Sequence, residues 1–140
     1  MKRKIFLLII FVIFIFASCG RSEEEPFVLQ PPPEREVIDI GEGGTVFRFE
    51  AIDYILDKQA WNVHTNEETV GAALYSLGLI DGDRTPFGLF ITTVNGLRTD
   101  FLEMGSWWSF YIDGCNIGIR GVDETIIEPG RVYTLVYSVE

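Results

Sequence analysis

The sequence predicts a domain of the α+β class, mostly β, in which a sheet of short antiparallel and mixed strands packs on one short helix. Three observations lead to this class. From Val37 onward, short runs of β-branched and aromatic residues are separated by turn residues. The dipeptides Asn95-Gly96 and Asp113-Gly114 are typical of two-residue hairpin turns. The segment from Thr69 to Leu77 has the apolar spacing of a helix.

The first element is a lipoprotein signal peptide, expected in residues 1–18. A basic start, Met1 to Lys4, precedes an unbroken apolar run from Ile5 to Phe16, as in secretory signals. A membrane-spanning helix needs about 20 apolar residues, so this run is too short to remain as an anchor. Ala17 and Ser18 before Cys19 resemble the lipobox of bacterial lipoproteins, although Phe16 stands where leucine is usual. An ordinary cleaved signal with an incidental cysteine is the alternative.

The second element is a lipidated tether, expected in residues 19–36. Acylation of Cys19 would attach the chain to membrane lipid, because two acyl chains suffice for stable anchoring. The segment that follows has little to bury, and Pro31 to Pro33 favours an extended polyproline conformation. The folded domain is then expected in residues 37–140, exported and held on the outside of the cell membrane.

Seven strands are expected in this domain, each bounded by turn residues. They are Val46 to Tyr54, Ala60 to Thr65, Gly88 to Val94, Leu97 to Phe101, Trp107 to Ile112, Cys115 to Ile119 and Arg131 to Val139. Asparagine or aspartate followed by glycine suits a type I′ turn, because both of its central positions need positive φ. The strands around these two dipeptides are therefore predicted to form hairpins.

One helix is expected between the second and third strands, with Thr69 as its N-cap and Gly78 in the left-handed C-terminal cap. Thr65 with Glu68 is an alternative capping box. The apolar stripe consists of Val70, Ala73, Leu74 and Leu77. The order of hairpin, helix, two hairpins and closing strand is typical of a β-grasp domain, and a small barrel or sandwich is the alternative.

Composition restricts the partners. The predicted signal contains three of the eleven basic residues, so the remainder has 8 basic and 21 acidic residues and a formal charge of −13. Such a charge excludes nucleic acid as a partner and opposes adhesion of the folded domain to anionic lipid. Solubility explains it, with a dedicated cation site as the alternative. If Cys19 is acylated, Cys115 has no partner for a disulfide within the chain.

No catalytic or metal-binding constellation is expected. The chain has one histidine, and it lacks a nucleophile elbow and a glycine-rich phosphate loop. His64 lies in an alternating strand, where an edge or solvent-facing histidine is more common than a metal ligand. Asp81-Gly82-Asp83 resembles the start of a calcium loop but lacks the later ligands, so it is predicted to be a turn that ends the helix. The protein is therefore not expected to be an enzyme or to require a cofactor.

The segment Trp107-Trp108-Ser109-Phe110-Tyr111 places four aromatic residues in five strand positions. Alternate side chains of a strand point to opposite faces of the sheet, so one face belongs to the core. The other face displays either Trp107 with Tyr111 or Trp108 with Phe110. Such a pair is an apolar platform for a flat ligand or a partner, unless the tether or a loop covers it.

Several ordered motifs resemble one known family. They are Thr69-Val70-Gly71-Ala72-Ala73-Leu74, Thr93-Val94-Asn95-Gly96, Trp108-Ser109-Phe110-Tyr111-Ile112-Asp113-Gly114, Gly121-Val122-Asp123 and Pro129-Gly130-Arg131-Val132-Tyr133. This set resembles the transcobalamin-like C-terminal domain family, over approximately Thr45 to Val139. Members are bacterial extracellular domains similar to the C-terminal β-domain of transcobalamin and intrinsic factor, which belongs to the soluble-ligand-binding β-grasp group.

The resemblance implies a non-catalytic binding domain whose ligand is a corrinoid such as cobalamin. In the vitamin carriers, contacts lie around a tryptophan that corresponds by position to Trp108, followed by Ser109 and Phe110. With Trp107 on the same strand, these four residues are the predicted ligand-binding set. The carriers' large helical barrel and its cobalt-ligating histidine have no counterpart here, and His64 does not correspond to that histidine. The alternative function is a protein-interaction or envelope-assembly module that binds another surface protein.

Overall fold

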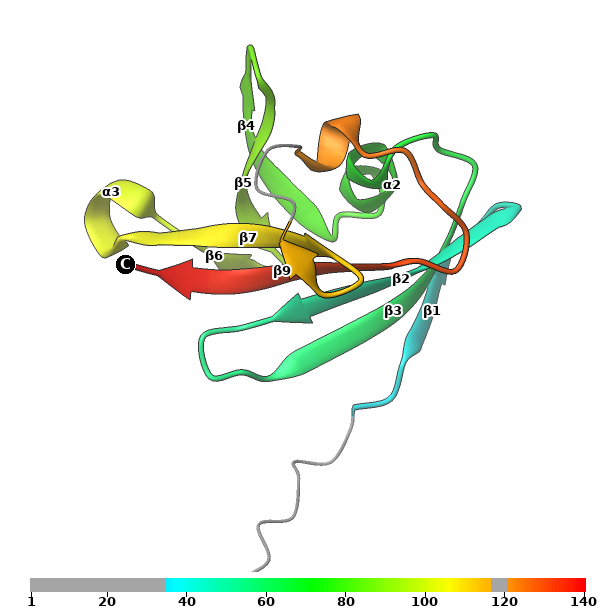
Figure 1. The fold of residues 1–140 in the computed structure, drawn as a ribbon, viewed down its shortest axis with the longest axis horizontal. Helices are drawn as coiled ribbons and strands as arrows, with labels where there is room; N and C mark the ends of the chain where they lie inside the picture. The colour runs from blue at the N-terminus through cyan, green and yellow to red at the C-terminus, as the bar shows by residue number, and fades with distance from the viewer. Residues whose placement is uncertain (1–34, 117–120) are drawn as a thin grey trace, which may run out of the picture. The chain divides into compact units, whose positions relative to one another are not determined.

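The computed structural model describes residues 35–116 and 121–140, whose arrangement is shown in Figure 1. The predicted signal peptide, Cys19 and most of the predicted tether lie outside the described residues. The described part is mostly β, with α2 (Val70–Ser76) as its principal helix, so the α+β fold class is confirmed. None of the described helices is long and apolar enough to cross a membrane.

In the described residues the strands form two sheets, an organisation that the sequence did not predict. The larger sheet has six strands in the order β1-β3-β2-β9-β7-β8, and the smaller has three in the order β4-β5-β6. In the larger sheet, β9 is parallel to β2 and antiparallel to β7. The bounds are β1 Ile38–Gly41, β2 Thr45–Ile52, β3 Lys58–Thr65, β4 Ile80–Thr85, β5 Gly88–Val94, β6 Leu97–Arg98, β7 Ser106–Ile112, β8 Cys115–Asn116 and β9 Val132–Val139.

The core lies between the six-stranded sheet and a layer that contains α2 and the smaller sheet (Figure 1). We call the sheet face that packs on this core the inner face, and the opposite face the outer face. The inner face contributes fully buried aromatic and aliphatic side chains, and alternate positions along β2 and β9 are more exposed. The inner-face core residues are Phe47, Phe49, Ala51, Trp61, Val63, Trp108, Tyr133 and Leu135.

Helix α2 begins and ends as predicted. The Thr69 hydroxyl accepts a hydrogen bond from the Ala72 backbone N–H at 3.2 Å, so Thr69 is the N-cap, rather than Thr65. Leu77 is the C-cap, and Gly78 after it has a φ of +69°. Leu74 is fully buried, which confirms that the apolar stripe faces the core.

Both predicted hairpin turns are present. Asn95 and Gly96 have φ values of +47° and +80°, and Asp113 and Gly114 have φ values of +47° and +79°. These are the paired positive values that a type I′ turn requires. The turns join β5 to β6 and β7 to β8.

The predicted strand from Leu97 to Phe101 is wrong in its second half, since β6 ends at Arg98. The Asp100 carboxylate accepts hydrogen bonds from the backbone N–H groups of Leu102 and Glu103. This cap begins α3 (Phe101–Met104), a helix of one turn that ends at Gly105. The hydrogen bonds of the Asp100 side chain therefore favour a helical turn over continuation of the strand at these residues.

The prediction that Asp81-Gly82-Asp83 is a helix-ending turn is also wrong, because these residues lie in β4. The strand has an irregularity between Asp81 and Gly82. A Cβ atom at Gly82 would lie 2.0 Å from the Phe90 carbonyl oxygen. Glycine is thus required here because the two strands approach closely. In the sequence, a glycine required for close packing looks the same as a glycine in a turn.

Other strands also depart from the prediction, several of them by one or two residues at their ends. β1 was not predicted; it pairs in parallel with β3. β2 ends at Ile52, so Tyr54 lies in the loop that follows. β8 is described only over Cys115–Asn116, and residues 117–119 of the predicted strand lie outside the described residues.

Candidate ligand-binding surface

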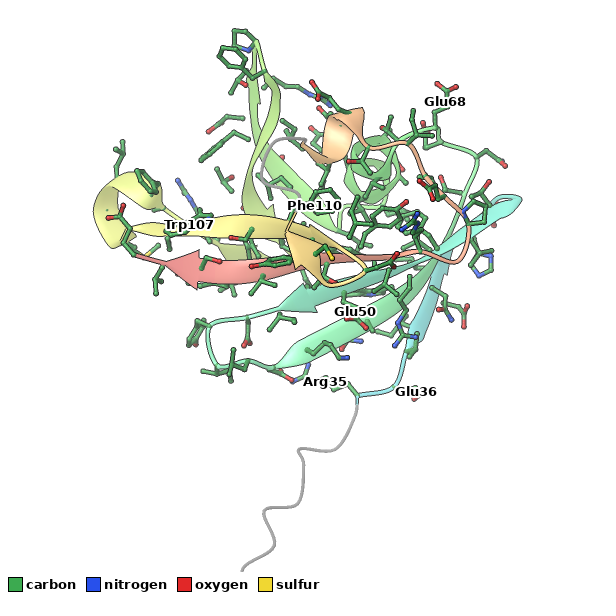
Figure 2. All side chains as sticks on the ribbon, viewed as in Figure 1. Arg35, Glu36, Glu50, Glu68, Trp107 and Phe110 are labelled. Atoms are coloured by element: carbon green, nitrogen blue, oxygen red, sulfur yellow. The ribbon has the colours of Figure 1, made fainter. Side chains whose placement is uncertain are left out.

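The four predicted ligand-binding residues all lie on β7, but on two faces. Trp108 is 9% exposed within the core, and Phe110 packs against the core from the same face. Trp107 and Ser109 point to the outer face and are half-buried. Figure 2 labels Trp107 and Phe110, one from each face. Of the two alternatives for the displayed pair, the structure therefore has Trp107 with Tyr111.

Hydrogen bonds fix the outer-face part of β7. The Trp107 indole N–H donates to the Ser109 hydroxyl at 2.9 Å, and the Ser109 and Ser138 hydroxyls are 2.8 Å apart. The Ser138 hydroxyl donates to the Val136 carbonyl oxygen at 3.3 Å, so its proton is used and Ser109 is the donor between the two serines. This directed chain holds the Trp107 ring in one orientation, and the ring of Phe101 packs edge-on against it at 6.1 Å.

A hollow of about 630 Å³ lies on the outer face next to these residues. Tyr111 forms one wall, two positions along β7 from Ser109 and on the same face. The Asp113-Gly114 turn forms another boundary. The remaining lining residues come from β2 and β9 and are Glu50, Ile52, Val132, Thr134 and Val136. The floor of the hollow is thus mixed. Thr134 lies at its centre, between Val132 and Val136 on β9, and pairs with Glu50 on β2 and Tyr111 on β7.

Paired charges surround the outer-face hollow. The Asp113 carboxylate accepts hydrogen bonds from the Val132 backbone N–H at 3.0 Å and from the Arg131 guanidinium at 2.7 Å. These two bonds, the backbone one foremost, hold the pKa of Asp113 below its ordinary value of 3.8. Glu50 lies 3.5 Å from Arg48 and 3.4 Å from Lys58. Because each carboxylate in the lining has a cationic partner, the hollow is suited to a ligand without a strong net charge.

Trp108 lines a second, smaller hollow of about 260 Å³ at the end of the sheet. Its indole N–H is buried and has no hydrogen-bond acceptor among the described residues. Tyr137 packs edge-on between Trp108 and Tyr54, at ring distances of 5.5 and 5.8 Å. Polar side chains at the mouth of this hollow include Asp53 and Gln59.

An exposed apolar cluster surrounds this end of the sheet, and the sequence analysis missed it. Two short segments contribute to it, the loop between β2 and β3 and helix α3. Its residues are Tyr54 (67% exposed), Ile55 (68%), Leu56 (79%), Phe101 (49%), Leu102 (94%) and Met104 (54%), and we call them the sheet-end patch. The sequence signal was the apolar run Tyr54-Ile55-Leu56, which begins at the last residue of the predicted strand from Val46 to Tyr54.

The tip of the β4–β5 hairpin carries another exposed aromatic side chain. Phe87 is 92% exposed, and Phe90 on β5 is 51% exposed. Pro86 and Gly88 flank Phe87 in the sequence, which is a turn signal that could have located it. This hairpin projects from the layer opposite the six-stranded sheet (Figure 1).

The reactive side chains of the described residues do not assemble into a metal centre. No group of three or more His, Cys, Asp and Glu side chains in residues 35–116 and 121–140 is placed to hold a metal ion. His64 Nε2 lies 3.2 Å from an Asp39 carboxylate oxygen, which joins β3 to β1. Cys115 is an exposed free thiol.

Sequence comparisons find no matching family model and no matching curated protein. Two solved structures are similar in fold. A protein from Ruminococcus gnavus ATCC 29149, whose description proposes metal binding, has a TM-score of 0.64 and 24% identity; the match covers 69% of this chain and 99% of that chain. Haptocorrin in complex with Cbi has a TM-score of 0.55 and 14% identity; the match covers 68% of this chain.

At these identities the likeness shows a shared fold. It carries no information about a shared activity. The match spans only 25% of the haptocorrin chain, so most of that protein has no counterpart in the alignment. The fold of this chain is thus similar to part of haptocorrin. The transcobalamin-like resemblance is supported at the level of fold.

Proposed function

We propose that the protein is an exported lipoprotein, anchored through Cys19, that binds a soluble ligand without catalysis on the outer face of its six-stranded sheet. The observation that carries this proposal is the outer-face hollow that Tyr111 lines, with Ser109 and Trp107 farther along the same face of β7. A corrinoid such as cobalamin is the candidate ligand, because the sequence motifs and the fold both resemble the β-domain of corrinoid carriers.

Size favours the outer face over the smaller hollow. Sites for small organic ligands usually have volumes of about 300 to 1,000 Å³. The outer-face hollow, at about 630 Å³, lies within this range, and the hollow lined by Trp108, at about 260 Å³, lies below it. We therefore place the ligand in the hollow lined by Tyr111, from which it would extend along the same face toward Ser109 and Trp107. We assign Trp108 and Phe110 to the support of the strand from within.

The chemistry of the face suits a large, flat and partly apolar molecule. Aliphatic side chains of Ile52, Val132 and Val136 offer apolar contacts, and the Tyr111 ring offers an aromatic wall. The carboxylates of Glu50 and Asp113 in the lining can accept hydrogen bonds from amide groups of a ligand. Since Trp107 is already held by Ser109, little side-chain entropy is lost on binding.

Calorimetric titration of the protein with cobalamin and cobinamide tests the proposal. Tyr111→Ala and Trp107→Ala should each weaken binding by about 1 kcal/mol or more, as expected for aromatic side chains at a contact surface. Phe87→Ala, on the distant β4–β5 hairpin, is the matched control and should leave affinity unchanged. Absence of binding by the wild-type protein would reject corrinoids as ligands, and an effect of Phe87→Ala alone would move the site to the hairpin.

Phe87 also supports the alternative function, a protein-interaction or envelope-assembly module. Its side chain, 92% exposed at the tip of a projecting hairpin, is accessible to a protein partner. Cross-linking from position 87 in intact envelopes would identify such a partner. Specific cross-links together with no corrinoid binding would favour this alternative.

A further inference from the structure

The sheet-end patch consists of two segments that lie at the same end of the six-stranded sheet. β2 ends at Ile52, which pairs with Val136 near the end of β9, and β9 ends opposite the start of β7 at Ser106. The β2–β3 loop follows β2 directly, and α3 directly precedes β7. Both segments therefore project from one end, as Figure 1 shows.

Local hydrogen bonds hold each segment in shape. In the loop, the Asp53 carboxylate accepts hydrogen bonds from the backbone N–H groups of Ile55 and Asp57, both at 2.9 Å. Leu56 has a φ of +63°, a strained value for a leucine. Ile55 and Leu56 are both exposed in this fixed loop, so it displays two apolar side chains to solvent.

Helix α3 displays its apolar side chains in the same manner. Asp100 caps its first turn, and Gly105 in the left-handed conformation ends it. Leu102 is 94% exposed between these caps. A one-turn helix is not stable by itself, so the fold positions Leu102 rather than leaving it in a free loop.

The chain enters the domain at this end. Arg35, the first described residue, forms an ion pair with Asp57 in the β2–β3 loop, and it is labelled in Figure 2. The Glu36 carbonyl oxygen accepts a hydrogen bond from the Gln59 side chain at the start of β3. Cys19 precedes Arg35 by 16 residues. A lipid anchor at Cys19 would therefore lie at most roughly 55 Å from this end of the domain.

The polar residues beside the patch indicate the kind of surface that it fits. Asp53, Asp57, Asp100 and Glu103 belong to these two segments or flank them, whereas Arg35, which pairs with Asp57, and Lys58 are the basic residues beside the loop. The excess of acidic groups opposes contact with an anionic surface at low ionic strength. A zwitterionic lipid interface accepts exposed aromatic and aliphatic side chains without this repulsion.

We propose that the sheet-end patch docks on the zwitterionic lipid interface to which the chain is anchored. The proposal rests on the anchoring through Cys19 proposed above and is independent of the ligand. The tether keeps the patch at a high effective concentration near the bilayer, so weak insertion of Leu56, Leu102 and their neighbours suffices. The outer-face hollow, on the side of the sheet rather than at its end, then stays open to solution.

Depth-dependent fluorescence quenching tests this docking. The lipidated full chain is reconstituted into phosphatidylcholine vesicles whose acyl chains are partly brominated, with tryptophan placed at the patch by Leu56→Trp or Leu102→Trp. Phe87→Trp is the matched control, because position 87 is equally exposed but lies on the β4–β5 hairpin. All three variants share the same background from the native tryptophans.

The emission of Leu56→Trp and Leu102→Trp should shift to shorter wavelength and be quenched by brominated lipid, and that of Phe87→Trp should not. Replacing part of the phosphatidylcholine with phosphatidylglycerol at low salt should reduce the quenching. Equal quenching at all three positions, or none at positions 56 and 102, would overturn the proposal. Protection of positions 56 and 102 from acrylamide in intact envelopes but not in vesicles would assign the patch to a protein instead.

Flotation separates failure of the anchor from failure of docking. If the wild-type chain does not float with the vesicles, the anchoring through Cys19 is wrong and docking fails with it. If the chain floats and the reporters at positions 56 and 102 remain unquenched, only the docking proposal is wrong.

Discussion

At the scale of residues, Trp107 and Trp108 are adjacent in the chain but differ in role because they face opposite sides of β7. Trp108 is 9% exposed and packs in the core, so Trp108→Ala should lower the free energy of unfolding by about 3 to 5 kcal/mol through loss of a large buried ring. Trp107→Ala should cost clearly less, because that ring is half-buried on the outer face. Urea denaturation of both variants measures the difference. Equal losses would contradict the assignment of faces.

Asp113 provides a second prediction at this scale. Its pKa lies below 3.8 because the folded chain donates hydrogen bonds to the carboxylate. The contribution of this carboxylate to the free energy of unfolding is therefore complete above the pKa that it has in the unfolded chain. The contribution is lost as pH falls through the lower pKa of the folded chain. Carbon-detected NMR titration should give a midpoint below 3.8 in the wild type. Arg131→Ala should raise this midpoint only in part, since the bond from the Val132 backbone has the larger effect; a full return to the ordinary pKa would contradict that order.

At the scale of elements, Gly71 shows why α2 contains a glycine in its first turn. A Cβ atom there would lie 2.2 Å from an Asp123 carboxylate oxygen and 2.9 Å from the Asp123 backbone nitrogen. That carboxylate also accepts hydrogen bonds from the Leu89 N–H and from Arg84. The glycine therefore permits the 3₁₀ helix η1 (Val122–Glu124) to pack against α2 and to join β5.

Gly71→Ala should accordingly destabilise the protein, although alanine in an unobstructed helix stabilises by about 1 kcal/mol relative to glycine. The expected loss is about 1 to 3 kcal/mol, as for an overpacked site. Ser76→Ala, at the exposed end of the same helix, should change stability by about 0.5 kcal/mol or less. Thermal or urea unfolding gives both values. A gain in stability for Gly71→Ala would contradict the close packing of η1 against α2.

The sequence predicted those elements whose signals are local. The α2 stripe, its Thr69 cap and the two type I′ turns depend on spacing and on φ preferences, and all three are confirmed. β4 was missed because Gly82 is required by close contact with Phe90, a residue of the neighbouring strand. The division into two sheets was missed for a related reason, since it depends on which strands pair over long distances in the chain.

The candidate site was predictable to a similar extent. Alternation along β7 restricted the displayed aromatic pair to two choices, but only the packing of Trp108 and Phe110 on the core selects between them. The hollow beside Tyr111 depends on β2 and β9, which are far from β7 in the sequence. No residue pattern within one strand could have predicted it.

At the scale of the whole molecule, the anchor yields a prediction about processing. If the proposed lipidation of Cys19 supplies the attachment, Cys19→Ser should leave unprocessed precursor or release the protein from membranes. Metabolic labelling with a palmitate analogue and phase partitioning measure this. Cys115→Ser is the control and should keep the label; a wild-type chain that takes no label and stays in the aqueous phase would show that the lipoprotein prediction is wrong.

The parallel pairing of β2 with β9 has a consequence for biosynthesis. These two strands are central neighbours in the six-stranded sheet, yet Arg48 and its partner Val132 are separated by 84 positions. Contacts between such distant segments slow folding, because a long loop must close before they form. The sheet can therefore not be completed until β9 has left the ribosome. If the chain is exported as proposed, this delay favours translocation, because the chain stays unfolded and able to pass through a narrow channel until β9 has been synthesised.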